Sequence, residues 1–228
     1  MYWDSTYILV LIGAAISALA SGRVNSTYGK YSRVFSRRGL AAQDAAAQIL
    51  RDAGIYDVRI ERIRGNLTDH YSPNEKVLRL SDSVYGSTSV AAIGVAAHEC
   101  GHAIQHNVGY GPLKLRSLSV PVANIGSKLS WPIVLLGILL GMGELAQIGV
   151  FLFSFVVFFQ LITLPVEFNA SGRALNILKR SGMLDETELN GAGKVLKAAA
   201  LTYVAALFSA MLQLLRLFLL TQRNQRRR

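Results

Sequence analysis

The sequence predicts an α-helical membrane protein with about four membrane-associated helices and one small α+β region. Of its 228 residues, 51% are hydrophobic and only 17% are charged, and the mean hydropathy is +0.33, which is unusually apolar for a soluble domain of this size. The apolar residues gather in stretches near the roughly 20 residues that a helix needs to cross a bilayer. This distribution excludes a disordered chain and a collagen-like chain.

The first apolar stretch, residues 5–22, is close to the minimum length of a membrane span. Only Asp4 is charged before it, so the stretch lacks the basic flank of a cleavable signal peptide. We therefore expect residues 1–22 to form a retained N-terminal transmembrane anchor.

The polar segment that follows, residues 23–118, predicts a small α+β region. Apolar and charged residues alternate in two short runs, which is typical of half-buried strands. A run of small and branched apolar residues that is too long for a strand predicts a buried helix, and the stretch 66–74 is rich in turn-forming residues. The expected elements are, in order, a helix, two strands and the buried helix, over residues 41–53, 58–63, 76–80 and 89–102.

The second apolar region, residues 122–166, is too long for one span and is interrupted at residues 141–144 by Gly-Met-Gly-Glu. A hairpin of two helices fits this pattern, and Pro165 should disturb its second helix and let the chain leave the membrane. The fourth stretch, residues 198–220, is long enough to span. It contains Gln213 and Arg216, so it either spans or lies partly in the interface.

The basic residues indicate the orientation of the chain, whose net charge is +10. Fourteen Lys and Arg lie in residues 23–128 and five more in residues 173–197, and helices that cross alternately place both regions on the same side. The positive-inside rule makes that side cytoplasmic. The basic C-terminal tail argues against a full fourth span, because a complete crossing would carry it outside.

Residues 98–102 read His-Glu-Cys-Gly-His, which matches the H-E-x-x-H pattern. Residues four apart on a helix lie about 40° apart in azimuth and one turn apart in height, so His98 and His102 can bind one metal ion. Glu99 lies close enough to reach a water on that metal without binding the metal, and it is then the general base for that water. The alternative is a buried helix whose two histidines are satisfied by hydrogen bonds.

A catalytic zinc site uses three protein ligands and one open position, so a third ligand is required. Glu167 is the best candidate because it directly follows the second hairpin helix, on the same side as His98. The alternative for Glu167 is an interfacial carboxylate paired with Arg173. Cys100 points away from the shared helix face and is predicted to be a small buried residue. As the only cysteine, it also excludes an intramolecular disulfide and a multi-cysteine zinc site.

Two blocks of sequence carry a resemblance to a known family. Residues 96–106 read Ala-Ala-His-Glu-Cys-Gly-His-Ala-Ile-Gln-His, and residues 165–171 read Pro-Val-Glu-Phe-Asn-Ala-Ser. Together with Asp-His-Tyr at residues 69–71, these blocks resemble the YugP-type bacterial membrane zinc metallopeptidases, over nearly the whole chain.

The resemblance implies a membrane-embedded gluzincin, related in plan to the HtpX and CAAX-prenyl endopeptidase families. In such an enzyme one Zn²⁺ per chain is held by His98, His102 and Glu167, and Glu99 is the catalytic base. The better-known relatives usually have an Asp four residues after the third-ligand Glu, where this chain has Ser171. The hydrogen bond that orients a ligand histidine must then come from Ser171, from Asn169 or from another group.

Three other residues are weaker candidates. His70 either stabilises the oxyanion of a tetrahedral intermediate or is a surface turn histidine. Arg173 either stabilises that oxyanion or pairs with Glu167. His106 lies eight residues after His98, where a helix face has drifted by about 80°, so we expect it to be structural. We also hypothesise that the strand at residues 76–80 is a sheet edge that holds an extended peptide.

The sequence thus predicts a zinc endopeptidase of the bacterial cell membrane, multi-pass, with its active site on the cytoplasmic side. It would act on peptides or membrane proteins at the lipid bilayer. One alternative is a catalytically silent membrane scaffold with a structural zinc site, and an association with an oligomer or a partner membrane subunit is left open. A nucleic-acid partner is not expected, because no recognition helix or concentrated basic groove is evident.

The chain is predicted to consist of five segments. These are an N-terminal anchor (1–22), a zincin-like catalytic region (23–118), a transmembrane hairpin (119–166), a third-ligand helix with a loop (167–197), and a C-terminal membrane helix with a basic tail (198–228).

Overall fold

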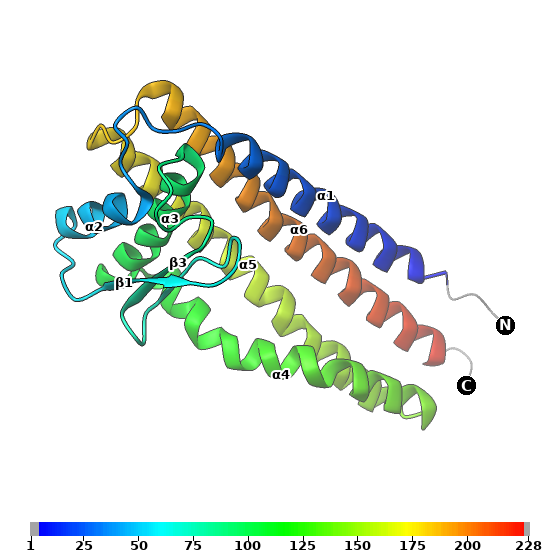
Figure 1. The fold of residues 1–228 in the computed structure, drawn as a ribbon. Coiled ribbons are helices and arrows are strands. Elements are labelled where there is room, and N and C mark those ends of the chain that lie inside the picture. Colours follow the sequence, from blue (N-terminus) through cyan, green and yellow to red (C-terminus); the bar gives the residue numbers. More distant parts are fainter. Residues whose placement is uncertain (1–4, 226–228) are drawn as a thin grey trace. The chain divides into compact units, whose positions relative to one another are not determined.

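The computed structural model describes residues 5–225, which form six helices and one three-stranded sheet (Figure 1). The elements are α1 (Tyr7–Tyr31), α2 (Ala42–Asp52), β1 (Arg59–Ile63), β2 (His70–Ser72), β3 (Val77–Ser81), α3 (Val90–Asn107), α4 (Gly111–Leu139), α5 (Gly143–Arg180) and α6 (Glu186–Gln225). By length and composition, α1, α4, α5 and α6 can each cross a membrane. The predicted fold class is therefore confirmed. The last three residues of the basic tail, 226–228, lie outside the described part of the chain.

The chain divides into two compact units. An apolar unit comprises the residues up to Ser21, residues 114–165 and the residues from Leu201 onward, and a polar unit comprises residues 22–113 and 166–200. Both units are discontinuous in sequence, because α1, α4, α5 and α6 each begin in one unit and end in the other.

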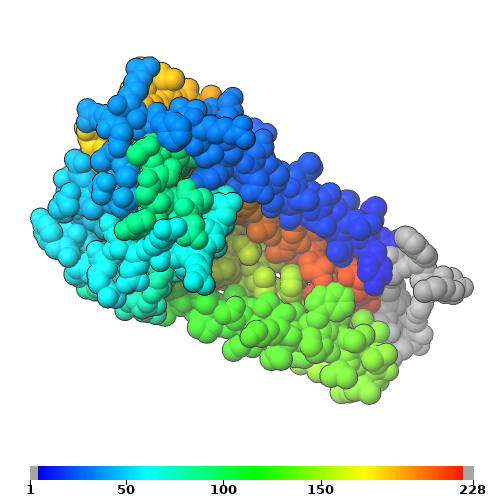
Figure 2. All heavy atoms as spheres, viewed as in Figure 1, coloured from blue at the N-terminus to red at the C-terminus, as the bar shows by residue number. Residues whose placement is uncertain are grey.

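In the apolar unit, glycines allow α4 and α5 to pack closely as the predicted hairpin. A Cβ atom on Gly126 would lie 2.4 Å from the carbonyl oxygen of Leu152, and one on Gly137 would lie 2.4 Å from the backbone nitrogen of Ala146. Large apolar side chains such as Leu118 point outward and are exposed, as lipid-facing residues are. In the view of Figure 2, α1 and α4 border a hollow in this unit, with α5 and α6 at its floor.

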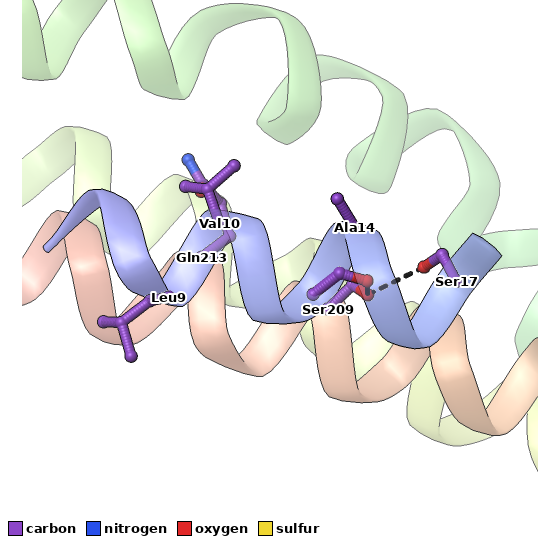
Figure 3. A pocket seen from close by; sticks show the side chains of 7 residues that line it. Leu9, Val10, Ala14, Ser17, Ser209 and Gln213 are labelled. Atoms are coloured by element: carbon purple, nitrogen blue, oxygen red, sulfur yellow. Dashed lines mark hydrogen bonds between the residues drawn. The ribbon is translucent and has the colours of Figure 1, made fainter. Parts of the chain in front are cut away.

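Small polar residues join α1 to α6 in the same unit. The hydroxyl groups of Ser17 and Ser209 lie 3.0 Å apart (Figure 3), and Ser209 also donates to the carbonyl oxygen of Gly13 at 2.9 Å. A pocket of about 230 Å³ lies along this contact. The charge of Arg216 within the apolar part of α6 is stabilised by two aromatic rings. Its buried guanidinium lies 4.1 Å from the ring of Tyr7 and 5.1 Å from that of Trp131. Arg216 therefore does not interrupt α6.

The polar unit has a sheet in the order β1-β3-β2, in which β1 is parallel and β2 antiparallel to β3. The two expected strands correspond to β1 and β3, whereas β2 lies within the stretch predicted as turns. The hypothesis that the strand at residues 76–80 is a sheet edge is wrong, because β3 is paired on both sides. The core beneath the sheet joins α2 to α3 through fully buried residues such as Ile49, Leu78 and Ile93.

The disturbance that Pro165 was expected to cause does not end the second hairpin helix. Pro165 lies inside α5, which runs unbroken to Arg180. Proline removes one hydrogen bond and costs roughly 3 kcal/mol in a helix interior, but the next turn is held by its own contacts. The carbonyl of Val166 accepts a hydrogen bond from Gln105 at 2.8 Å, and Ala170 is completely buried. Glu167 is consequently fixed within a helix.

Candidate metal centre

Helix α3 carries the H-E-x-x-H residues through the core of the polar unit. Its N-terminus is capped by Ser89, whose side chain accepts a hydrogen bond from the backbone nitrogen of Ala92 at 3.2 Å. The rings of His98 and His102 lie one turn apart with their centroids 4.8 Å from each other, in an edge-to-face arrangement. The helix therefore presents both imidazoles on the same side, as the four-residue spacing predicts.

The helix α5 brings Glu167 to these imidazoles. Its Oε2 atom lies 3.3 Å from Nε2 of His98 and 3.5 Å from Nε2 of His102, and the side chain is only 3% exposed. These residues make up the one group in the described part of the chain whose nitrogen, sulfur or carboxylate oxygen atoms converge closely enough for a metal, with all ligand atoms within 4.8 Å. The structure thus brings together the three predicted ligands across some 70 residues of sequence.

The distances from Glu167 to the two histidines match those between zinc ligands, while the three donor atoms as a group lie within 4.8 Å of one another. Zinc holds nitrogen and oxygen ligands at about 2.0–2.2 Å in a tetrahedron, which places any two ligand atoms about 3.3–3.6 Å apart. The two distances from Glu167 to the histidines fall in or at this range. Two imidazoles and one carboxylate are also the set found in catalytic sites that keep a fourth position open.

The outer nitrogen of each histidine has its own partner. Nδ1 of His98 lies 3.1 Å from the hydroxyl of Ser171, and Nδ1 of His102 lies 3.0 Å from Oε1 of Gln105. Ser171 thus occupies the position where the better-known relatives have Asp, and it contacts a candidate ligand directly. Gln105 was not predicted to belong to the site. Its position three residues after His102, on the same helix face, could have indicated a contact between the two side chains.

The hydrogen bonds of Gln105 determine the tautomer of His102. The amide nitrogen of Gln105 donates to the carbonyl oxygen of Val166 at 2.8 Å and to Oδ1 of Asn169 at 3.0 Å. Both of its hydrogens are therefore used, so its oxygen accepts from Nδ1 of His102. The Oδ1 assignment of Asn169 is supported in turn, because it also accepts from Nε of Arg173 at 2.8 Å. The proton of neutral His102 is held at Nδ1, and the lone pair at Nε2 faces Glu167.

The charges around this group favour a cation. Burial acts to lower the pKa of His102, but the hydrogen bond to Glu167 and the negative charges of Glu99 and Glu167 outweigh it and raise that pKa above its usual value. Two carboxylates next to the imidazoles thus stabilise positive charge among the three donors. A bound metal ion supplies such a charge.

The remaining candidates lie outside this group. Nδ1 of His70, on β2, is 2.9 Å from the carbonyl oxygen of Thr68, and Nδ1 of His106 is 2.9 Å from the hydroxyl of Tyr71. The thiol of Cys100 is completely buried and faces the carbonyl oxygen of Ala46 at 3.6 Å. The guanidinium of Arg173 lies 5.9 Å from the ring of Tyr110.

The fold and this donor set together define a membrane protein with a buried His-His-Glu centre, which is the class to which zinc peptidases of the membrane belong. The chain belongs to the family described as "Putative neutral zinc metallopeptidase", whose model matches residues 6–222. It is similar to the "Putative membrane protease YugP" of Bacillus subtilis, with 48% identity over 208 residues that cover 91% of this chain and 92% of that protein. The comparison with solved structures found no match.

Proposed function

We propose that the chain is a membrane-embedded zinc endopeptidase in which His98, His102 and Glu167 bind one Zn²⁺ and Glu99 is the general base. The observation that carries this proposal is the convergence of a buried Glu167 oxygen on the Nε2 atoms of both histidines at 3.3 and 3.5 Å. The membership of the zinc metallopeptidase family supports the metal and the reaction class.

The roles of the protein groups follow from their placement. Zinc in this position would polarise the peptide carbonyl and lower the pKa of an attacking water. Glu99 lies next to His98 on α3 and is 8% exposed, so it is a carboxylate close to the donor group without belonging to it. Glu99 takes the proton from the water and passes it to the nitrogen of the leaving amine, so that the carboxylate is regenerated when the peptide bond breaks.

His70 has a narrower role in this proposal. The carbonyl oxygen of Thr68 is an acceptor only, so Nδ1 of His70 carries the proton that joins them. The Nε2 atom of a neutral His70 is then an acceptor. His70 stabilises a developing oxyanion only when its ring is fully protonated.

We further propose that an extended segment of the substrate pairs with the outer edge of β2. This strand is an edge of the sheet, and it lies in contact with α3. Backbone pairing holds peptides of varied sequence by their main chain. The substrates would be membrane proteins or their cytoplasmic segments, since the distribution of basic residues favours a cytoplasmic polar unit.

The test is the zinc content of the purified full-length chain, together with hydrolysis of an unfolded protein such as casein. We expect about one zinc per chain in the wild type and its loss in Glu167→Ala and His98→Ala. The variant Glu99→Gln should retain zinc and lose hydrolysis, and His106→Ala, as a matched control, should retain both.

The silent-scaffold alternative makes a different prediction. A structural zinc site needs no base, so the wild type would bind zinc and hydrolyse nothing, and Glu99→Gln would be indistinguishable from it. If Glu167→Ala kept its zinc, the third ligand would have to be another residue.

A further inference from the structure

A basic groove lies between α5 and α6 in the polar unit, and it has no part in the chemistry described above. Its volume is about 780 Å³. The polar side chains along it are Asn176, Lys179, Glu186, Asn190, Lys194 and Lys197. Three ammonium groups and one carboxylate give the groove a net positive charge.

The three lysines of the groove are not used by the fold. Within residues 5–222, whose side chains the structure describes, none of their ammonium groups forms a hydrogen bond or an ion pair. Each is exposed. Their ammonium groups are therefore open to a ligand.

If α6 enters the membrane at Leu201, two of the lysines lie at the level of the lipid headgroups. Lys197 lies four residues before Leu201, where the apolar unit resumes, and Lys194 lies seven residues before it. At 1.5 Å per residue these positions are about 6 and 10 Å along the helix axis from that point. The headgroup layer is about 5–8 Å thick in each leaflet, and a lysine side chain can reach toward it along the helix.

The wall of the groove that α5 forms has an open position at Gly172. Gly172 lies seven residues after Pro165 on α5, also about 10 Å along its helix, and a Cβ atom at Gly172 would have nothing within 4 Å. Glu186 lies eleven residues before Lys197, about 16 Å away along α6, so its carboxylate does not neutralise this end.

We propose that the end of the groove at Lys194 and Lys197 binds the phosphate of an anionic lipid headgroup. The two ammonium groups lie three residues apart on one face of α6 and can donate to the same phosphate. The acyl chains of the lipid then follow the apolar continuation of the helix. Two features favour an anionic lipid over other ligands. A neutral lipid offers no net negative charge to the lysines, and a soluble anion makes no use of the apolar part of α6 next to them.

The experiment uses the full-length chain in a neutral detergent, and the apparent dissociation constant of added lipid is measured by native mass spectrometry. The probes are phosphatidylglycerol, phosphatidylcholine and inorganic phosphate. We expect phosphatidylglycerol to bind about tenfold or more tightly than phosphatidylcholine. The double variant Lys194→Gln/Lys197→Gln should lose this preference, and Lys194→Arg/Lys197→Arg should keep it.

The matched control is Lys179→Gln/Arg180→Gln, which removes the same charge from the last turn of α5, where Lys179 lines the groove. It should bind phosphatidylglycerol like the wild type. Equal losses in both glutamine variants would reduce the effect to overall charge and overturn the proposal. Equal binding of the two lipids, or full displacement of phosphatidylglycerol by inorganic phosphate, would overturn it as well. The metal site plays no part in any of these outcomes, so the proposal stands or falls independently of the peptidase activity.

Discussion

Gln105 is the residue on which the orientation of His102 depends. Its side chain is fully buried and forms hydrogen bonds to a candidate ligand on one side and to the helix that carries Glu167 on the other. It therefore links the two helices of the candidate metal centre and holds the proton of His102 on the nitrogen that faces away from Glu167. Groups with this role are worth about 10–100-fold in metal affinity.

We expect Gln105→Leu to weaken zinc binding by about 10–100-fold, because the leucine cannot accept the proton of Nδ1. The measurement is competition with a chelator of known affinity, and the spectrum of bound Co²⁺ reports any change in ligand geometry. Gln48→Leu, a similar change on α2, should bind zinc like the wild type. An unchanged dissociation constant in Gln105→Leu would remove this residue from the metal centre.

Cys100 should be chemically inert in the folded protein. Burial raises the pKa of its thiol far above the usual value, and the negative charge of Glu99 raises it further. At pH 8 the folded chain therefore has less thiolate than the unfolded chain, and thiolate is the reactive form. We expect iodoacetamide to alkylate Cys100 rapidly only after denaturation, and Cys100→Ala to keep one zinc. Rapid alkylation of the native protein would contradict the buried placement.

The contact between α3 and α5 depends on Gly101. A Cβ atom at this position would lie 2.6 Å from the carbonyl oxygen of Ala170, which is closer than such atoms approach in proteins. The backbone of one helix thus lies directly against the other, one residue before His102 and three residues after Glu167. Because the two helices are in direct backbone contact, the positions of the histidines on α3 and of Glu167 on α5 can vary little relative to each other.

Gly101→Ala should push α5 away from α3. We expect a loss of stability of about 1–3 kcal/mol, typical of an overpacked core, together with weaker zinc binding, and both can be followed by thermal melting with and without zinc. Gly172→Ala is the control, because its Cβ atom has open space and alanine favours a helix by about 1 kcal/mol over glycine. Equal melting temperatures for Gly101→Ala and the wild type would show that the helices can separate at little cost.

The elements that sequence predicts best are those with a long periodic or apolar signal. The apolar helices, the H-E-x-x-H helix and the break at residues 141–144 all follow from local composition. The strand β2 was missed because it has three residues among turn-forming neighbours and is defined by its pairing with β3. The prediction at Pro165 failed because it rested on the low helix propensity of proline. Contacts with residues far away in the sequence hold the helix instead.

The candidate site likewise contains residues that the sequence predicts and contacts that it does not. His98, Glu99 and His102 are recognisable from their spacing on one helix, and Glu167 from its place after an apolar stretch and from its family resemblance. The hydrogen bond between Gln105 and Asn169 joins residues 64 positions apart. No local pattern contains it, because it exists only once α3 and α5 have packed together.

At the scale of the whole molecule, the order of spans fixes the side on which each loop lies. If all of the apolar helices cross the membrane, the α4–α5 turn is on the opposite side from the polar unit. In a Cys100→Ala background, a membrane-impermeant maleimide should label Met142→Cys in intact cells and should label Tyr56→Cys only after permeabilisation. Both side chains are exposed, at 54% and 81%, so access depends on the membrane alone. Labelling of Tyr56→Cys in intact cells would reverse the orientation.

The unbroken run of α5 from its apolar part to Glu167 makes the donor set inseparable from the bilayer. His98 and His102 precede the α4–α5 hairpin in the chain and Glu167 follows it, so every contiguous fragment that holds all three also holds two apolar helices. No cut that releases a water-soluble piece leaves a complete site. If this centre is the active site, as proposed, proteolysis cannot release the chain from its membrane in active form.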